Sequence, residues 1–247
     1  MNQTIASQLS HRTIREFTTD PVPEETMAQI FQVARQTASS RGLQQTAIIR
    51  VRDQAKRDAL AVIGNQEYVA RAPEYLLFII DAHRSAAILE EMGVAVHQAA
   101  SVDVFTEAFT DACLMAQNVV VAAESLGFGA NYLGNILNDP QGVVDLLGLP
   151  KLTFPVVGLT LGMPNQSPQL KPRMDMSLRV MENGYTEPES WLEALSEYDE
   201  TMQTYYDLRE ANKKVDSYTN QVKTRLGRPT PSRDRILDTI RAQGFDF

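Results

Sequence analysis

The sequence predicts a protein of the α/β or α+β class, with one β-sheet covered by helices on both faces. Three observations predict this class. Segments with the pattern of strands alternate along the chain with segments of helical pattern. Residues 75–80 (YLLFII) are apolar throughout, as expected for a strand with helices on both faces. Residues 102–126 are rich in alanine and apolar almost all round, which is typical of a buried central helix.

The first 51 residues predict two helices and a strand. Ile5 and Leu9 are four residues apart, so a first helix is expected here, with residues 10–17 at its end. A second helix is expected to begin at 20–25, where proline lies in the first turn and acids lie near the positive end of the helix dipole. This helix should end near 38–42, and the β-branched residues in 46–51 favour a strand.

The second half of the chain continues the alternation after Gly127, which is expected to end the central helix. The remaining predicted elements, in chain order, are an extended segment at 131–134, a short helix at 140–147, a third strand at 154–161, a long loop at 163–172 and an amphipathic helix at 191–208.

Composition limits the class of protein. A chain of 247 residues with 43% hydrophobic content can bury a substantial core. The single cysteine, Cys113, excludes an internal disulfide and a thiolate cluster for a metal, and its apolar helical setting predicts a small core residue. The net charge of -8 disfavours nucleic-acid binding. Without a secretory pattern or a membrane-spanning stretch, the chain is predicted to be cytoplasmic and free of the membrane.

Three cationic side chains lie within five residues near the N-terminus: His11, Arg12 and Arg15. If residues 10–17 end the first helix, Arg15 lies one turn from the other two, and all three can converge on one phosphate. The alternative is a solvated basic face without a ligand.

Two further basic segments lie in the C-terminal part. Lys171 and Arg173 flank a proline, so both fall on the same side of an extended chain, either to bind an anion or simply solvated. Residues 209–241 contain nine Lys or Arg against four Asp or Glu, a local charge of +5 in an acidic chain. This basic region can hold a small anionic ligand or serve as a soluble surface.

Five segments, taken in order, resemble the nitroreductase-like flavoenzymes, and most closely their NADPH-dependent, oxygen-insensitive nitroreductase and flavin reductase branch. The segments are His11-Arg12-Thr13-Ile14-Arg15, Ala38-Ser39-Ser40 with Leu43-Gln44, Gln66-Glu67-Tyr68-Val69, Gly129-Ala130-Asn131-Tyr132-Leu133-Gly134, and Leu170-Lys171-Pro172-Arg173. Each motif is weak alone, but their order over nearly the whole chain is specific. In one place the sequence departs from the pattern, because Asn135 follows Gly134 where relatives often carry a second glycine.

The resemblance implies an α+β fold with a central mixed β-sheet covered by helices on both faces. It implies an FMN-binding core in residues 1–162 and a C-terminal excursion with a basic tail in 163–247, which embraces the partner subunit of a homodimer.

The resemblance also implies the site residues. Those expected to bind FMN are His11, Arg12, Thr13, Arg15, Ser39, Ser40, Gln66, Tyr132, Leu133, Gly134, Lys171 and Arg173. Arg209, with Lys213 and Lys214 as neighbours, is expected to hold the 2′-phosphate of NADPH. No metal and no catalytic side chain is expected, because the flavin itself carries the hydride chemistry.

The implied activity is hydride transfer from NADPH to small electron acceptors, namely nitroaromatics, quinones or free flavin, by a ping-pong route. Two alternatives stay open. One is a dedicated FMN reductase that supplies reduced flavin to a partner. The other is a flavin-binding sensor or carrier without turnover.

Overall fold

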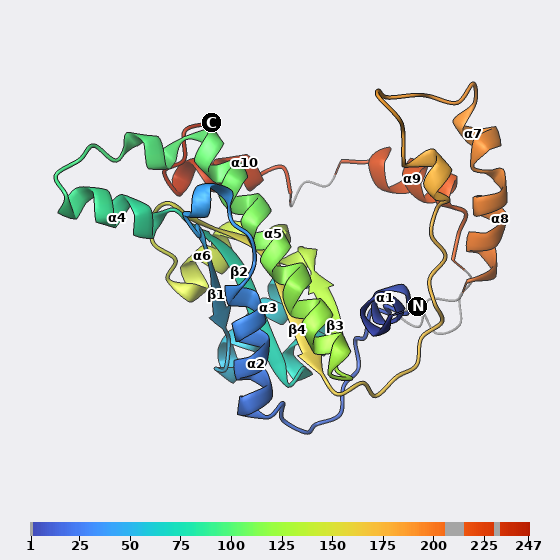
Figure 1. Ribbon diagram of the computed structural model, residues 1–247, viewed down its shortest axis with the longest axis horizontal. Helices are drawn as coiled ribbons and strands as arrows, with labels where there is room; N and C mark the ends of the chain where they lie inside the picture. The colour runs from blue at the N-terminus through green and yellow to red at the C-terminus, as the bar shows by residue number, and fades with distance from the viewer. Residues whose placement is uncertain (1, 206–214, 230–232) are drawn as a thin grey trace. The chain divides into compact units, whose positions relative to one another are not determined.

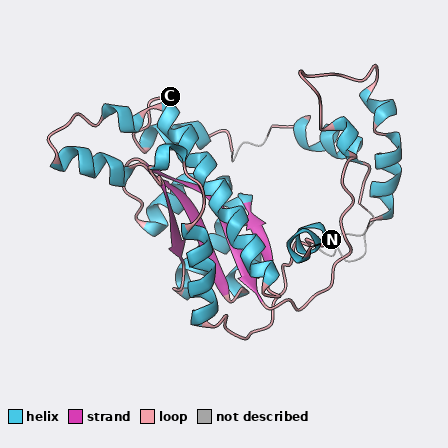
Figure 2. Ribbon diagram, in the orientation of Figure 1, coloured by secondary structure: helices cyan, strands magenta, loops and turns pink. Residues whose placement is uncertain are grey.

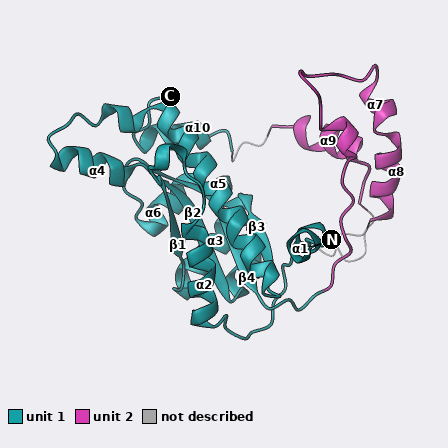
Figure 3. Cartoon of the chain, in the orientation of Figure 1, with its two compact units in different colours: residues 1–166, 231–247 teal, residues 167–230 magenta. Residues whose placement is uncertain are grey.

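A computed structural model of the chain describes residues 2–205, 215–229 and 233–247 (Figure 1). The chain divides into two compact units, one formed by residues 1–166 with 231–247 and the other by residues 167–230 (Figure 3). Residues 231–247 thus group with the first unit by their contacts, and the division at residue 162 stays a prediction.

The first unit contains a four-stranded sheet with the strand order β1-β2-β4-β3 (Figure 2). Its strands are β1 (Thr46–Arg50), β2 (Glu74–Asp81), β3 (Gly129–Leu133) and β4 (Thr153–Gly162), which confirms the strands predicted at 46–51, 75–80 and 154–161.

The predicted mixed sheet is wrong for these four strands, because each of their three pairings is antiparallel. The physical reason is visible between β1 and β2. The chain leaves β1 at Val51, runs through α3 (Gln54–Gly64), and returns to the same end of the sheet, where the Val51 amide donates to Tyr75 O at 2.9 Å. Alternation of helices with strands does not reveal this return. Parallel pairing occurs as a single-residue bridge, for example between Thr13 and Ala130.

Helices cover both faces of the sheet, as the sequence predicted (Figure 1). On one face, Leu76, Phe78 and Ile80 of β2 pack against α2 (Glu24–Arg35) and α5 (Val102–Ser125). On the other face, Tyr75, Leu77 and Ile79 pack among residues of α3 and α6 (Pro140–Leu147). Successive side chains of β2 thus point to opposite faces of the sheet and belong to two hydrophobic cores.

The central helix α5 confirms the predicted segment 102–126, but it is not buried all round. Its buried stripe includes Ala108, Ala112 and Ala116, at a spacing of four residues. Cys113 and Leu114 lie beside this stripe and are exposed, Leu114 to 48%. The prediction that Cys113 is a core residue is therefore wrong, because an apolar composition does not reveal which side of the helix faces the sheet.

The first unit contains further short elements around this core. They are α1 (Gln3–Leu9), η1 (Ser40–Gly42), η2 (Glu67–Arg71), α4 (His83–Glu91), η3 (His97–Ala100), η4 (Gly134–Asn138) and α10 (Ile236–Ala242). Within the described ranges, no helix has the length and apolar character needed to cross a membrane.

The second unit contains η5 (Met176–Leu178), α7 (Trp191–Ala194), α8 (Ser196–Thr204) and α9 (Tyr218–Leu226). The single helix predicted at 191–208 is interrupted at Leu195, which is 5% exposed, and α8 ends at Thr204, before an extended Tyr205. Residues 206–208 lie outside the described residues.

Candidate functional site

The N-terminal cation cluster lies outside a helix, so the predicted helical stacking of its side chains is wrong. Ser10 caps the C-terminus of α1, and the following segment runs beside β3. Thr13 forms the bridge to Ala130, and the Ile14 amide donates to Ala130 O at 3.0 Å. Ile14 is buried, whereas Thr13 and Arg15 on either side are half-buried. Alternation along this strand-like segment places His11, Thr13 and Arg15 on one side.

His11 is held by a carboxylate from the far end of α5. Its Nδ1 lies 2.5 Å from Glu124 Oε1, and the two side chains are 30% and 13% exposed. With Nδ1 bonded to this acceptor, Nε2 is the ring nitrogen left for a ligand. Arg12 Nη1 donates to Ser10 O at 2.9 Å, which fixes the segment at the end of α1.

Arg15 is a half-buried cation that has neither a hydrogen bond nor an ion pair within the described ranges of the chain. The acid that follows it, Glu16, instead pairs with Arg71 Nη2 at 3.0 Å. A guanidinium with five donors and no protein acceptor is suited to bind a phosphate from outside the chain.

Gln66 lies in a polar network that fixes the orientation of its amide. Its Oε1 accepts from the Tyr68 hydroxyl at 2.6 Å and from Asn135 Nδ2 at 3.0 Å. Asn131, which is 4% exposed, donates to the same Tyr68 hydroxyl at 3.4 Å. Because the amide oxygen is already used, Gln66 presents its NH2 group, a donor for a ligand acceptor. Gln66 also lines an open cavity of about 610 Å³ beside α3.

The structural reason for glycine differs between the two glycine positions of the segment 129–134. A Cβ at Gly129 would lie 2.5 Å from the Ile14 side chain, so glycine is required there by packing within the chain. A Cβ at Gly134 would meet no atom within 4 Å, so packing gives no reason for glycine, and the backbone is open to a ligand. Arg233, from the predicted basic region, donates to Gly134 O at 2.8 Å.

Asn135, which replaces the second glycine of the family pattern, turns away from this open backbone. Its Nδ2 donates to Gly64 O at 3.1 Å. A Cβ at Gly64 would come within 2.2 Å of Asn135 Nδ2, so the glycine in α3 makes room for the asparagine. The departure from the pattern therefore does not fill the space over Gly134.

Tyr132 and Leu133 contribute in different ways. Leu133 is 2% exposed and belongs to the core under α3 and α6, so its backbone is the part that can face a ligand. Tyr132 is 37% exposed, and its hydroxyl donates to Gln117 Oε1 of α5 at 3.0 Å. Burial of the hydroxyl, together with the Glu124 charge, raises the pKa of Tyr132 and keeps it a donor.

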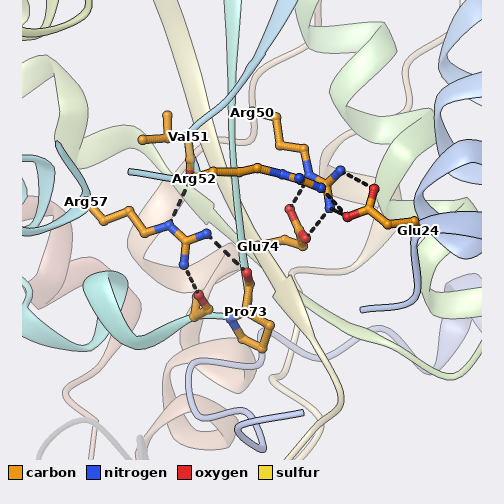
Figure 4. Close-up of polar contacts among 8 residues, drawn as sticks. Glu24, Arg50, Val51, Arg52, Arg57, Pro73 and Glu74 are labelled. Atoms are coloured by element: carbon orange, nitrogen blue, oxygen red, sulfur yellow. Dashed lines mark hydrogen bonds and ion pairs between the residues drawn. The ribbon is translucent and has the colours of Figure 1, made fainter. Parts of the chain in front are cut away.

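Arg57 connects the parts of the chain before and after the stretch that carries Gln66 (Figure 4). Arg57 donates from Nε to Val51 O at 2.7 Å, from Nη1 to Ala72 O at 2.9 Å, and from Nη2 to Pro73 O at 3.3 Å. The guanidinium thus joins the end of β1 to the beginning of β2, on either side of α3 and η2. Desolvation by burial lowers the pKa of Arg57, although an arginine remains charged.

A second arginine, Arg50, neutralises the buried carboxylate beside this joint (Figure 4). Its Nε donates to Glu74 Oε2 at 2.7 Å, and its Nη1 donates to Glu24 Oε2 at 2.7 Å. Glu74 is only 5% exposed, so its charge needs this partner. The hydrogen bond with Glu74 is the main cause that raises the pKa of Arg50.

The turn that contains Ser39 and Ser40 contacts α5 at a different place, through Asp111. Asp111, which is 2% exposed, accepts from the Ser40 amide at 3.0 Å and from the Ser40 hydroxyl at 3.2 Å. Asp111 and the His11 partner Glu124 are thirteen residues apart on α5, which corresponds to about 20 Å along a helix axis. Within one chain, the Ser39–Ser40 turn and the N-terminal cluster therefore do not meet.

The remaining predicted residues lie in other parts of the chain. Lys171 and Arg173 are exposed in the second unit, where Arg173 Nη1 donates to Lys171 O at 3.3 Å. Their role in the flavin site stays a prediction. Arg209, Lys213 and Lys214, the predicted NADPH ligands, lie outside the described residues.

The sequence reasoning missed the residues that hold these side chains, above all Asp111, Glu124 and Arg57. The first two carried a weak signal, because each is an acid in the alanine-rich helix 102–126, where an unpaired buried charge is costly, but Asp103 and Glu107 of the same helix share it. No such signal marked Arg57, whose acceptors are backbone carbonyls.

Comparison with known proteins shows the family of the chain. Residues 9–163 match the Nitroreductase family, and residues 171–247 match the Nitroreductase family, C-terminal domain. The chain is 39% identical to NADPH-flavin oxidoreductase of Vibrio harveyi and 37% identical to oxygen-insensitive NADPH nitroreductase of Salmonella typhimurium, with 99% of each chain covered.

Solved structures show the same fold. Nitroreductase A from Vibrio parahaemolyticus superposes with a TM-score of 0.89 at 37% identity, over 99% of this chain and 98% of that one. NADPH:FMN oxidoreductase from Vibrio harveyi complexed with NAD+ gives a TM-score of 0.88 at 37% identity, over 99% of both chains. The α+β fold, the ordered motifs and these full-length matches establish that the chain belongs to the nitroreductase family.

Proposed function

We propose that the protein is an FMN-containing oxidoreductase that takes hydride from NADPH and reduces nitroaromatics, quinones or free flavin by a ping-pong route. The observation that carries the proposal is Arg15, a half-buried guanidinium without an acceptor in the described parts of the chain, in a segment that runs beside β3. The relatives named NADPH-flavin oxidoreductase and NADPH nitroreductase support the same activity.

The donor set fits FMN at both ends of the cofactor. His11, Arg12 and Arg15 supply cationic donors for the phosphate, and the family resemblance implies Lys171 and Arg173 as further cations. The Gln66 amide and the open backbone at Gly134 supply neutral polar groups suited to the ring, beside Tyr132 and Leu133. Bound FMN would supply the hydride chemistry.

The protein itself binds the flavin, orients it and adjusts its reactivity. A cation at Arg15 and an oriented amide at Gln66 favour a ligand with an anion and a ring acceptor, and the Gly134 backbone permits close approach. No side chain needs to move a proton at the reacting atom for this chemistry. The family resemblance implies that Arg209, Lys213 and Lys214 would bind the 2′-phosphate of NADPH.

We further propose a homodimer in which two chains complete each flavin site. The separation of about 20 Å between Asp111 and Glu124 along α5 supports this arrangement, because Ser39 and Ser40 then serve the N-terminal cluster of the other chain. The exposed apolar side of α5 at Leu114 offers a surface for association. A cytoplasmic location remains part of the proposal.

An anaerobic NADPH titration tests the activity. The protein is supplemented with FMN, freed of unbound flavin, and followed by its visible absorbance. We expect bleaching at about one NADPH per bound flavin, because each hydride carries two electrons. A bound flavin that stays yellow would indicate a sensor or carrier, and failure to retain flavin would contradict the proposal. Rates with free FMN and with a nitroaromatic at equal concentration then separate a dedicated FMN reductase from a nitroreductase.

A further inference from the structure

Asp111 is a buried carboxylate without an ion pair within the described ranges. It lies next to Ala112 on α5, and in the described part of the chain the hydrogen bonds that its carboxylate accepts all come from Ser40. Both of its oxygens accept from the Ser40 amide, at 3.0 and 3.2 Å, and one also accepts from the Ser40 hydroxyl. A buried charge persists only where it is hydrogen-bonded, so this contact defines the place of the turn.

The turn that begins at Ser39 has an unusual backbone. Arg41, Gly42 and Gln44 have φ values of +53°, +70° and +52°, in the left-handed region. Non-glycine residues keep such angles only where surrounding contacts impose them. Besides Asp111, those contacts include a bond from the Gln44 amide to Ser39 Oγ at 3.2 Å and a bond from Arg84 Nη2 to Gln44 O at 2.6 Å. Arg41 also pairs with Asp103 at 2.6 Å and with Glu107 at 2.9 Å.

These contacts also determine whether the hydroxyls of Ser39 and Ser40 can donate a hydrogen bond to a ligand or accept one from it. Because a carboxylate only accepts, Ser40 must donate its hydroxyl hydrogen to Asp111, and its oxygen lone pairs remain for a ligand donor. Ser39 Oγ already accepts from Gln44, so its own hydrogen remains for a ligand acceptor. An adjacent acceptor and donor match a chain of hydroxyl groups, each of which both donates and accepts.

We infer that Asp111 is a positioning residue that orients the Ser40 hydroxyl and thereby holds the Ser39–Ser40 turn in place to bind the ribityl chain of the flavin. The inference rests on the proposed function, because it concerns the same flavin site. Asp111 does not touch the flavin in this account and acts only through Ser40.

The test compares binding of two flavins to the apoprotein, followed by quenching of flavin fluorescence. FMN carries the ribityl phosphate, whereas lumiflavin has the same ring and no ribityl chain. For Asp111→Asn, which places an amide group against the Ser40 donors, we expect the Kd for FMN to rise about tenfold relative to the wild type. The Kd for lumiflavin should stay within about twofold. Asp145→Asn, the same substitution at an exposed residue of α6 away from the turn, is the matched control and should leave both constants unchanged.

A double-mutant cycle isolates the route through Ser40. Ser40→Ala should weaken FMN binding, and adding Asp111→Asn should then cost less than it does in the wild type. If Asp111→Asn does not fold, as judged by circular dichroism, Ser40→Ala alone must still distinguish FMN from lumiflavin. Unchanged FMN affinity, or an equal loss for lumiflavin, would overturn the inference. A wild type that binds no FMN would instead contradict the proposed function.

Discussion

Arg15 carries the largest expected share of phosphate binding among the described N-terminal cations. Arg12 already donates to Ser10 O, and His11 is bonded to Glu124, whereas Arg15 has its full set of donors open within the described parts of the chain. Its half-buried position strengthens a charge-assisted bond, because water competes less there.

For Arg15→Ala we therefore expect FMN binding to weaken by about 1.5 to 3 kcal/mol, since one charge-assisted contact is lost. Isothermal titration of the apoprotein with FMN measures the change. Arg35→Ala, an exposed arginine at the end of α2, removes the same charge away from the cluster and should have little effect. Equal affinities for wild type and Arg15→Ala would remove the N-terminal cluster from the site.

At the scale of single residues, the sequence predicted cations and amides but not what holds them. His11 and Gln66 were candidates from the ordered motifs, and the structure shows each fixed by a partner, Glu124 and Tyr68 respectively. Glu124 is more than a hundred residues from His11 in the sequence, whereas Tyr68 is two residues from Gln66. Tertiary pairing of the first kind leaves no local pattern in a single sequence.

At the scale of elements, the joint between β1 and β2 depends on one side chain. Arg57 donates to three backbone carbonyls that flank α3 and η2, the elements around Gln66. A buried carbonyl that loses its donor is costly, because no water replaces the bond.

Arg57→Met keeps the length of the side chain and removes its donors, so we expect the free energy of unfolding to fall by about 2 to 3 kcal/mol. Urea unfolding followed by circular dichroism measures it. Arg52→Met provides the comparison, because Arg52 is 58% exposed in its pair with Glu24, and should change stability less. Similar losses in both variants would show that the joint does not depend on the carbonyl contacts.

Whether a predicted helix or strand was located correctly depended on how long and how regular its pattern of apolar residues is. The apolar strand β2 and the long helix α5 were located correctly because each has a core-facing pattern over its whole length. The end of α1 was wrong because Ile5 and Leu9 give two points of a period and no stop signal. The antiparallel return from β1 to β2 was missed because alternation of helices with strands does not reveal at which end of the sheet the chain re-enters it.

At the scale of the whole molecule, α5 separates the two halves of the proposed site. If two chains complete each flavin site, defects in different halves should complement one another. Arg15→Ala damages the N-terminal half, and Ser39→Phe obstructs the turn held near Asp111.

We expect each variant alone to have little activity, whereas a mixed dimer isolated with two different tags should recover about half of the wild-type rate. In such a dimer one site carries both defects and the other carries neither. The NADPH-dependent reduction of a nitroaromatic measures the recovery. If both halves came from the same chain, every site in the mixed dimer would carry one defect, and no recovery would occur.

The exposed position of Cys113 has a chemical consequence for observing this assembly. It is the single thiol of the chain, and it lies on α5 beside the exposed Leu114. Partial desolvation raises the pKa of the Cys113 thiol, so little thiolate exists at neutral pH and alkylation is slow until the solution is made alkaline. The Cys113 thiol is thus a single, slowly reacting nucleophile on the surface proposed to join two chains. Its rate of alkylation measures directly whether that surface is accessible to a reagent in solution.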